Sequence, residues 1–352
     1  MPEHFAYKEI KEGAEAVRKT LAENKTVVEK IVEELERRNV KKGFIIGSGT
    51  SFHASLALNY LLTKYTDYHF TAIQASEFED WTPLVTSDYV IIGFSQSGES
   101  SDIIRAIEVA REKGVFVIGI TNTPGSTLTK ISDVALVTRA GEEKAVVATK
   151  TYDSQLAIGS LLALSLSKYE ETSSLLTQLE KIPETLNEII KHEKYFKEIA
   201  EKYKESEHIF ILGRGINYAN ALEAGLKFKE AAMIHSEGFA VREFLHGPIQ
   251  LVDENTPVII YVPTEYSLKQ SEKTINKLKS YNARVIAVTG ENLKIDFAQE
   301  IIRIPSVHED LSAIPVIKPI QFLAYFISIA RGYNPDKPTK LTKVVKYEES
   351  RK

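Results

Sequence analysis

The sequence predicts an α/β protein that consists of two tandem, doubly wound parallel-sheet domains of flavodoxin-like topology, followed by a C-terminal tail. Apolar runs suited to buried strands alternate with amphipathic helical segments, which is typical of a parallel sheet covered on both faces. The turns after these runs also recur at nearly constant separations, which indicates a duplicated domain. The separations are 166, 169 and 168 positions for the pairs Gly47 and Gly213, Ser95 and Thr264, and Thr121 and Thr289.

The individual elements follow from this alternation. Residues 1–40 are charged and carry apolar residues at helical spacing, so they form a helical lead-in. The strand candidates are 44–46, 89–92 and 115–118 in the first half, and 209–212, 257–261 and 284–288 in the second. The segment 151–196 is helical in pattern and includes the connector. We therefore divide the chain into a lead-in at 1–40, a first domain at 41–185, a second domain at 186–332 and a tail at 333–352.

Composition narrows the classes of function. The chain has 352 residues, 43% of them hydrophobic, which is enough for two cores. With 48 acidic and 44 basic side chains the net charge is −4, and no basic run with interleaved aromatics suggests a nucleic-acid partner. No apolar stretch looks long enough to cross a bilayer and no signal peptide is recognised, so we expect a cytoplasmic protein without a membrane partner. The absence of cysteine excludes disulfides, zinc–thiolate sites and thiol nucleophiles within this sequence.

The most informative motif is GFSQSGES at residues 93–100, directly after an apolar run. Hydroxyls, backbone N–H groups and the N-terminus of a following helix can together hold a dianion without a metal. We call residues 95–100 the serine loop, and it predicts a phosphorylated ligand. The alternative is an ordinary serine-rich helix cap, because serine is a favoured capping residue.

Several strings in a fixed order resemble the sugar isomerase (SIS) domain family, most closely the isomerase half of glucosamine-6-phosphate synthase. The resemblance extends from about Phe5 to about Lys346. The strings are KEI at 8–10, GTS at 49–51, SQSGES at 95–100, TNTPGS at 121–126, ATK at 148–150, LGRG at 212–215, ALEAGLKFKE at 221–230, HGP at 246–248 and the tail at 332–343.

This resemblance implies three catalytic residues. Glu230 matches the carboxylate that moves a proton between C1 and C2 of the sugar, although a charged residue on a lysine-rich helix is more often simply solvated. His246 matches the residue that opens the sugar ring, and in relatives it reaches the neighbouring subunit's site, so a homodimer is implied. Lys343 matches a lysine that forms a Schiff base with the open-chain ketose, or that here binds the open chain.

The resemblance also implies the substrate contacts, and it implies no cofactor and no metal. Phosphate contacts are expected from Ser51, Ser95, Gln96, Ser97 and Ser100, and further sugar contacts from Val146, Ala148, Glu223 and Lys227. Glu223 and Lys227 precede Glu230 at helical spacing, so all three can project to one face. The chain departs from the synthase at several positions. Ser100 replaces Thr and keeps the hydroxyl, Val147 and Ala148 replace small residues in the sugar-binding strip, and Arg242, which replaces Gly, is expected to be a surface arginine.

Because the sequence has no cysteine and the match begins at the isomerase portion, we expect no glutaminase domain. The chain then resembles the stand-alone SIS-type glucosamine-6-phosphate deaminases. The expected reaction converts glucosamine 6-phosphate to fructose 6-phosphate and ammonia. The alternatives are a deglycase or deaminase of another amino sugar phosphate, an isomerase subunit that uses ammonia from a partner, and a phosphosugar sensor without catalytic activity.

Overall fold

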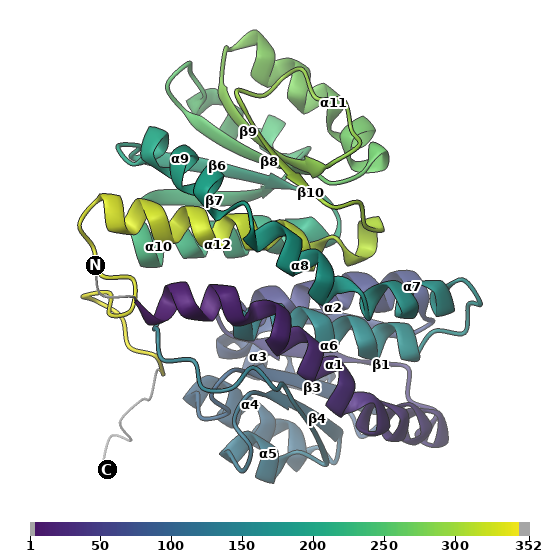
Figure 1. The fold of residues 1–352 in the computed structure, drawn as a ribbon. Helices are drawn as coiled ribbons and strands as arrows, with labels where there is room; N and C mark the ends of the chain where they lie inside the picture. Colours follow the sequence, from purple (N-terminus) through teal and green to yellow (C-terminus); the bar gives the residue numbers. More distant parts are fainter. Residues whose placement is uncertain (1–3, 345–352) are drawn as a thin grey trace. The chain divides into compact units, whose positions relative to one another are not determined.

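The computed structural model describes residues 4–344, which form two compact units (Figure 1). The amino-terminal unit comprises residues 15–143, 150–179 and 342–344, and the carboxyl-terminal unit comprises 4–14, 144–149 and 180–341. Each unit contains one five-stranded parallel sheet with helices on its faces, so the predicted fold class is confirmed. The domain boundaries drawn from the sequence stay predictions, and residues 345–352 of the predicted tail lie outside the described residues.

In the amino-terminal unit the strands lie in the order β2-β1-β3-β4-β5. The long helix α1 (Phe5–Arg38), predicted as the lead-in, has its first residues in the other unit. The remaining elements are β1 (Lys42–Gly47), α2 (Thr50–Tyr65), β2 (His69–Gln74), η1 (Ala75–Glu77), α3 (Phe78–Trp81), η2 (Thr82–Leu84), β3 (Tyr89–Ser95), α4 (Ser101–Glu112), β4 (Phe116–Thr121), α5 (Thr127–Ile131), β5 (Val134–Val137), α6 (Lys150–Ser165) and α7 (Thr172–Leu179).

The carboxyl-terminal unit repeats the same topology, with the order β10-β9-β8-β6-β7. If β6 is matched to β1, every strand has a counterpart at the same position of the other sheet. The elements are α8 (Ile182–Ile190), α9 (Glu193–Tyr203), β6 (His208–Gly213), α10 (Ile216–Ala232), β7 (His235–Ala240), η3 (Glu243–Leu245), η4 (Pro248–Leu251), β8 (Pro257–Val262), α11 (Glu265–Ser280), β9 (Arg284–Gly290), β10 (Glu300–Ile304), η5 (Glu309–Leu311) and α12 (Ala313–Ala330).

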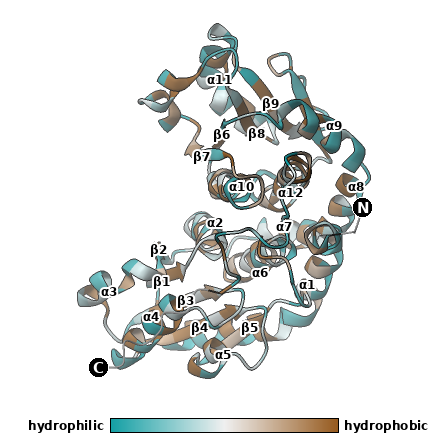
Figure 2. Ribbon diagram, turned by 90° about the vertical axis from the view of Figure 1, so that its left-hand side faces the viewer, coloured by the Kyte–Doolittle hydropathy of each residue, from teal (hydrophilic) through white to brown (hydrophobic). Residues whose placement is uncertain are grey.

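The helix α12 is the most apolar of the long helices in the carboxyl-terminal unit, and Figure 2 shows it largely brown beside the hydrophilic α9. Its length and composition would allow it to cross a membrane, which corrects the sequence-based expectation that no stretch is long enough. However, 78% of this stretch is buried inside the protein, and no other helix in the described range 4–344 meets these criteria. The continuous apolar pattern is explained by burial of α12 among α8, α9 and α10.

Candidate functional site

The serine loop of the amino-terminal unit connects β3 to α4. Ser95 is buried, and its Oγ accepts a hydrogen bond from the backbone N–H of Gly98 at 3.0 Å. Ser97 Oγ accepts one from the N–H of Glu99 at 3.1 Å. A hydroxyl that accepts in this way still has its own proton to donate to a ligand. Ser100 caps α4 without a side-chain capping bond. The loop therefore presents hydroxyls beside a helix N-terminus, an arrangement that suits an anion.

Ser51 lies at the start of α2, just after the loop that follows β1, at the point where the strand order reverses. The strand β1 lies between β2 and β3, and Ile46 of β1 pairs with Gly93 of β3, so the loops after both strands leave the same edge of the sheet. Ser51 is buried in the first turn of α2, and its Oγ accepts a hydrogen bond from Gln155 Nε2 at 3.0 Å. Ligands of doubly wound sheets bind at such a crossover.

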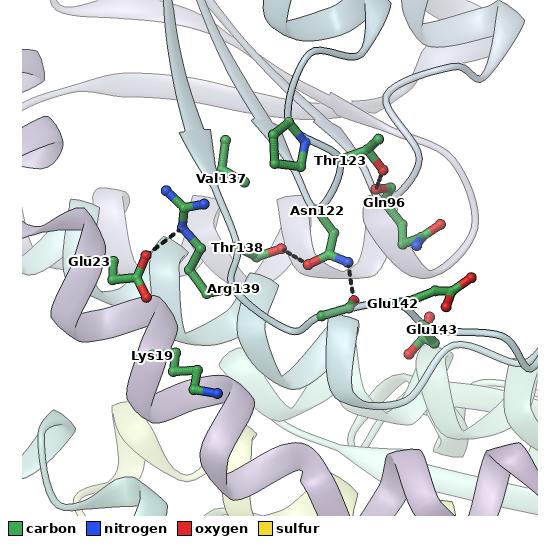
Figure 3. Close-up of a pocket in the computed structure, with 12 residues that line it drawn as sticks. Lys19, Glu23, Gln96, Asn122, Thr123, Val137, Thr138, Arg139, Glu142 and Glu143 are labelled. Atoms are coloured by element: carbon green, nitrogen blue, oxygen red, sulfur yellow. Dashed lines mark hydrogen bonds and ion pairs between the residues drawn. The ribbon is translucent and has the colours of Figure 1, made fainter.

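Gln96 lines a pocket of about 570 Å³ in the amino-terminal unit (Figure 3). Asn122, which follows β4, is fixed in the pocket wall. Its Nδ2 donates to the carbonyl oxygen of Gly141 at 2.7 Å, and its Oδ1 accepts from Thr138 Oγ1 at 2.9 Å (Figure 3). The backbone N–H of Asn122 donates to the carbonyl oxygen of Gln96 at 3.0 Å. The serine loop and the turn after β4 are thus joined by hydrogen bonds.

Lys343 also belongs to the amino-terminal unit, where it forms an ion pair with Glu143. Its Nζ lies 3.0 Å from Glu143 Oε2, and the Glu143 side chain is fully buried. The same carboxylate accepts from the N–H of Thr151 at 3.2 Å and from Thr151 Oγ1 at 2.8 Å, at the start of α6. Glu143 therefore links the segment at residue 343 to the first turn of α6. Sequence reasoning did not single out Glu143, because its role depends on residues distant in the chain.

In the carboxyl-terminal unit, α10 brings Glu223, Lys227 and Glu230 together. Lys227 Nζ lies 3.2 Å from Glu223 Oε1 and 2.6 Å from Glu230 Oε2. The side chains of Lys227 and Glu223 are 1% exposed, whereas that of Glu230 is 20% exposed. Burial by itself lowers the pKa of Lys227, but the charges of Glu223 and Glu230 and their hydrogen bonds outweigh it and raise that pKa above its ordinary value. The lysine thus stays an ammonium ion that holds both carboxylates.

Glu230 is the member of this group whose side chain borders a pocket. It lines a pocket of about 700 Å³ in the carboxyl-terminal unit, together with Leu226 and Lys229 of α10 and with the segment 332–341. Sequence reasoning missed Tyr261 of β8, which is fully buried. Burial, followed by the negative charge of Glu223, raises the pKa of Tyr261 well above its ordinary value.

Val146 and Ala148 lie in the segment 144–149 of the carboxyl-terminal unit, and both are partly exposed. The backbone N–H of Val146 donates to the carbonyl oxygen of Asp336 at 3.1 Å. The Asp336 carboxylate in turn accepts from the N–H groups of Phe5 and Ala6, at 2.9 Å and 2.7 Å. These bonds connect the predicted sugar-binding strip to the tail and to the start of α1.

His246 is not among the described residues that line the pocket of Glu230. It is exposed at the end of η3, and its backbone N–H donates to the carbonyl oxygen of Glu243 at 2.9 Å. The nearby Arg242 is exposed and donates through Nη2 to Gln270 Oε1 at 2.6 Å, as a surface arginine does. Among residues 4–344, no group of three or more His, Cys, Asp or Glu side chains is arranged to hold a metal ion.

Comparisons with known proteins agree with this architecture. The SIS domain family matches residues 38–165 and 202–329, one match in each half of the chain. The glutamine–fructose-6-phosphate aminotransferase (isomerizing) of Pyrococcus horikoshii is 36% identical over 350 residues, which is 98% of this chain and 58% of that protein. The corresponding enzyme of Thermotoga maritima is 34% identical over 357 residues, with 98% and 59% covered. The chain thus spans a little under three fifths of these relatives.

Solved structures give the same assignment. The C-terminal domain of glucosamine-fructose-6-phosphate aminotransferase from Francisella tularensis matches with a TM-score of 0.89 and 27% identity, covering 96% of this chain and 98% of that one. The glucosamine-6-phosphate deaminase of Thermotoga maritima matches with a TM-score of 0.71 and 26% identity, covering 97% and 99%. With a matching SIS domain in each half, this chain belongs to the SIS domain family.

Proposed function

We propose that this protein is a glucosamine-6-phosphate deaminase, which converts glucosamine 6-phosphate and water to fructose 6-phosphate and ammonia. The observation that carries the proposal is the α10 group, in which the buried Lys227 holds Glu230 at the wall of a pocket. The comparisons support the same substrate class. The deaminase of Thermotoga maritima and the C-terminal domain of the aminotransferase of Francisella tularensis both match with nearly all of their chains covered.

In the proposed reaction the serine loop and Ser51 bind the phosphate. Ser95, Ser97 and Ser100 donate hydroxyl protons to the phosphate oxygens, and the N-terminus of α4 adds its positive dipole end. Gln96 contributes its side-chain amide. These groups fix the C6 end of the sugar, while the reacting carbons lie at the other end of the molecule.

The chemistry at C1 and C2 is assigned to His246 and Glu230. His246 opens the ring by moving the O1 proton to the ring oxygen. The Glu230 carboxylate then removes the C2 proton while O1 gains a proton, and it returns its proton to C1 as the amine loses one. This leaves an imine at C2, to which water adds before ammonia departs. Lys227 orients Glu230 throughout, and Glu223 fixes Lys227.

Lys343 is proposed to bind the open-chain sugar through its ammonium group. A lysine forms a Schiff base only when its amine is neutral. The Nζ atom of Lys343 lies 3.0 Å from the carboxylate of the buried Glu143, and we assign this lysine a binding role in preference to a covalent one. Val146 and Ala148 are proposed to contact the sugar hydroxyls.

The test is to incubate the purified full-length chain with glucosamine 6-phosphate and to follow ammonia and fructose 6-phosphate together. Glu230→Gln keeps the size of the side chain but cannot carry the proton, so we expect turnover to fall about 10²- to 10⁴-fold. The matched control is Glu272→Gln on the exposed side of α11, which should leave turnover unchanged. Tight binding of the phosphosugar without any ammonia would overturn the proposal in favour of a sensor.

Two further substrate sets separate the remaining alternatives. Fructose 6-phosphate with ammonium tests an isomerase that uses ammonia, a possibility raised by the similarity to the aminotransferases. Galactosamine 6-phosphate and a fructosamine 6-phosphate test the other sugars. Higher kcat/KM with any of these than with glucosamine 6-phosphate would reassign the substrate.

A homodimer with His246 supplied across the interface, and a cytoplasmic location, are also part of this proposal. If the histidine acts in the partner's site, a mixture of Glu230→Gln and His246→Ala chains that has been allowed to exchange subunits should regain activity that neither variant has alone. No recovery in a mixture shown to exchange subunits would place His246 and Glu230 of one chain in the same site.

A further inference from the structure

The first residues of β6 and β7 form a pair of histidines to which the proposed reaction assigns no step. His208 and His235 are partners in the parallel register, and both are exposed at the amino-terminal edge of the sheet. Their Nδ1 atoms lie 3.2 Å apart, with the ring centroids 5.3 Å apart and the planes nearly perpendicular at 80°. His235 also lines the pocket that Glu230 borders.

We propose that His208 and His235 chelate a divalent transition-metal ion through their two Nδ1 atoms. Metal–nitrogen bonds of about 2.0–2.1 Å with tetrahedral angles place two ligand nitrogens about 3.3 Å apart. The Nδ1 separation of 3.2 Å therefore already matches one edge of a coordination tetrahedron. Without metal, one Nδ1 must carry a proton that it donates to the other. On binding, that ring moves its proton to Nε2, and water completes the coordination.

The surroundings of the pair suit a cation. Glu237 Oε1 lies 3.9 Å from His235 Nε2, on the side of the ring away from His208. At this distance the carboxylate forms no hydrogen bond to the ring, but its negative charge favours a bound cation. On the other side, His208 borders a polar pocket that also contains Glu205, Glu207 and Asp253. Two basic residues also line this pocket: Lys202 is paired with Glu300 at 2.7 Å, and Arg284 lies over the ring of Tyr203.

The first repeat provides an internal comparison. Lys42 and His69 occupy the equivalent positions of β1 and β2, each 166 residues before His208 and His235. There the lysine is paired with Asp88 at 2.7 Å and cannot replace the second imidazole. The duplicated scaffold thus holds a histidine pair in one unit and a single histidine in the other. We expect metal binding in the carboxyl-terminal unit alone.

Binding would attach the start of the edge strand β7 to β6, the strand beside it in the sheet. The strand is also linked to α10, because Ser236 Oγ donates to the carbonyl oxygen of Gly225 at 2.7 Å. A metal at His235 therefore stabilises the region that follows the α10 group. Although His235 lines the pocket that Glu230 borders, the proposed reaction assigns no step to either histidine.

The experiment uses the untagged full-length protein after treatment with a chelator and dialysis. Titration calorimetry with Zn²⁺ and with Ni²⁺ should show one ion bound per chain, and Cu²⁺ should bind more tightly. Mg²⁺ should not compete, because it prefers oxygen ligands. His208→Asn and His235→Asn should each weaken binding at least about tenfold. The control His69→Asn, at the equivalent exposed position, should bind like the wild type.

A spectroscopic measurement keeps the test independent of how the variants fold. The electron paramagnetic resonance spectrum of the wild-type protein with one equivalent of Cu²⁺ should show coupling to imidazole nitrogens, and His208→Asn should lose part of that coupling. Unchanged affinity in both His208→Asn and His235→Asn, or binding that disappears in His69→Asn, would overturn the proposal. So would the absence of any Zn²⁺ or Ni²⁺ binding to the wild type.

Discussion

Lys227 Nζ lies 2.6 Å from Glu230 Oε2, and this lysine is almost completely buried on α10. The same ammonium group lies 3.2 Å from Glu223, so one cation serves two carboxylates. Only Glu230 borders the pocket. A buried charge of this kind is tolerated because its partners compensate the loss of hydration. The stability of α10 and the orientation of Glu230 therefore depend on the same side chain.

We expect Lys227→Met to lower the free energy of unfolding by about 3–5 kcal/mol, because the buried Glu223 would lose its compensating charge. Urea denaturation followed by circular dichroism measures the change. Lys229→Met, on the exposed side of the same helix, serves as the control and should shift stability by less than about 0.5 kcal/mol. The double variant Lys227→Met with Glu223→Gln should recover part of the loss. An equal effect of the two lysine substitutions would contradict this account.

Ser95→Ala should weaken phosphate binding by roughly tenfold, because the serine loop would lose one hydroxyl donor and the bond that closes its turn. Competition of inorganic phosphate with the phosphosugar measures the effect. Ser87→Ala, exposed before β3, is the control. A phosphate affinity equal to that of the control would show that the loop is only a helix cap.

Gly98→Ala tests the backbone of the same loop. Gly98 has a φ of +66°, and a Cβ at this position would lie 2.2 Å from Ser126 Oγ. We expect alanine to distort the loop and to lower stability by roughly 1–3 kcal/mol. Gly125→Ala is the matched control. It also has positive φ but no atom within 4 Å of a Cβ, so its cost should be smaller. Thermal unfolding of the two variants compares them directly.

The strands predicted from the sequence and the strands that were missed occupy different positions in the two sheets. All six predicted apolar runs are inner strands, and the four missed strands, β2, β5, β7 and β10, are the four sheet edges. An inner strand is buried on both faces and gives a continuous apolar run. An edge strand has one open side, and β7 accordingly contains His235, Glu237 and Gly238, which do not fit a strand pattern.

Two parts of the candidate site could be predicted because their residues lie close together in the sequence. The serine loop follows a buried strand, and the helical spacing of Glu223, Lys227 and Glu230 places them on one face of α10. The partnership of Lys343 with Glu143 joins residues 200 positions apart, so no periodicity reveals it. Tyr261 was missed for a different reason. A tyrosine within an apolar run is typical of a buried strand and gives no sign of a functional role.

Glu143→Gln should release the segment around Lys343. The amide can still contact Thr151 but cannot form the ion pair, so we expect a loss of about 1–3 kcal/mol in the free energy of unfolding. Limited proteolysis should also cut the chain near residue 343 faster than in the wild type. Glu142→Gln at the neighbouring exposed position is the control. Unchanged stability and unchanged proteolysis would show that the ion pair does not hold this segment.

The last prediction concerns Tyr261 and alkaline pH. Its hydroxyl is fully buried and has no hydrogen-bond partner among residues 4–344, and its pKa is raised by burial and by Glu223. Because the unfolded chain ionises this tyrosine near its ordinary pKa of about 10, the folded state loses stability as pH rises above that value. The raised pKa of Lys227 acts in the same direction, since its contribution is complete below about 10.4 and is lost at higher pH.

Tyr261→Phe removes the unpaired hydroxyl without a change of shape. We therefore expect it to raise the free energy of unfolding at pH 7 by about 1 kcal/mol and to make the decline above pH 10 shallower. Guanidinium unfolding at pH 7, 9, 10 and 11 tests both statements. Tyr281→Phe, which is 43% exposed, should change neither the stability nor its pH dependence. A lower stability of Tyr261→Phe at pH 7 would mean that the hydroxyl forms a bond, with bound water as the first partner to look for.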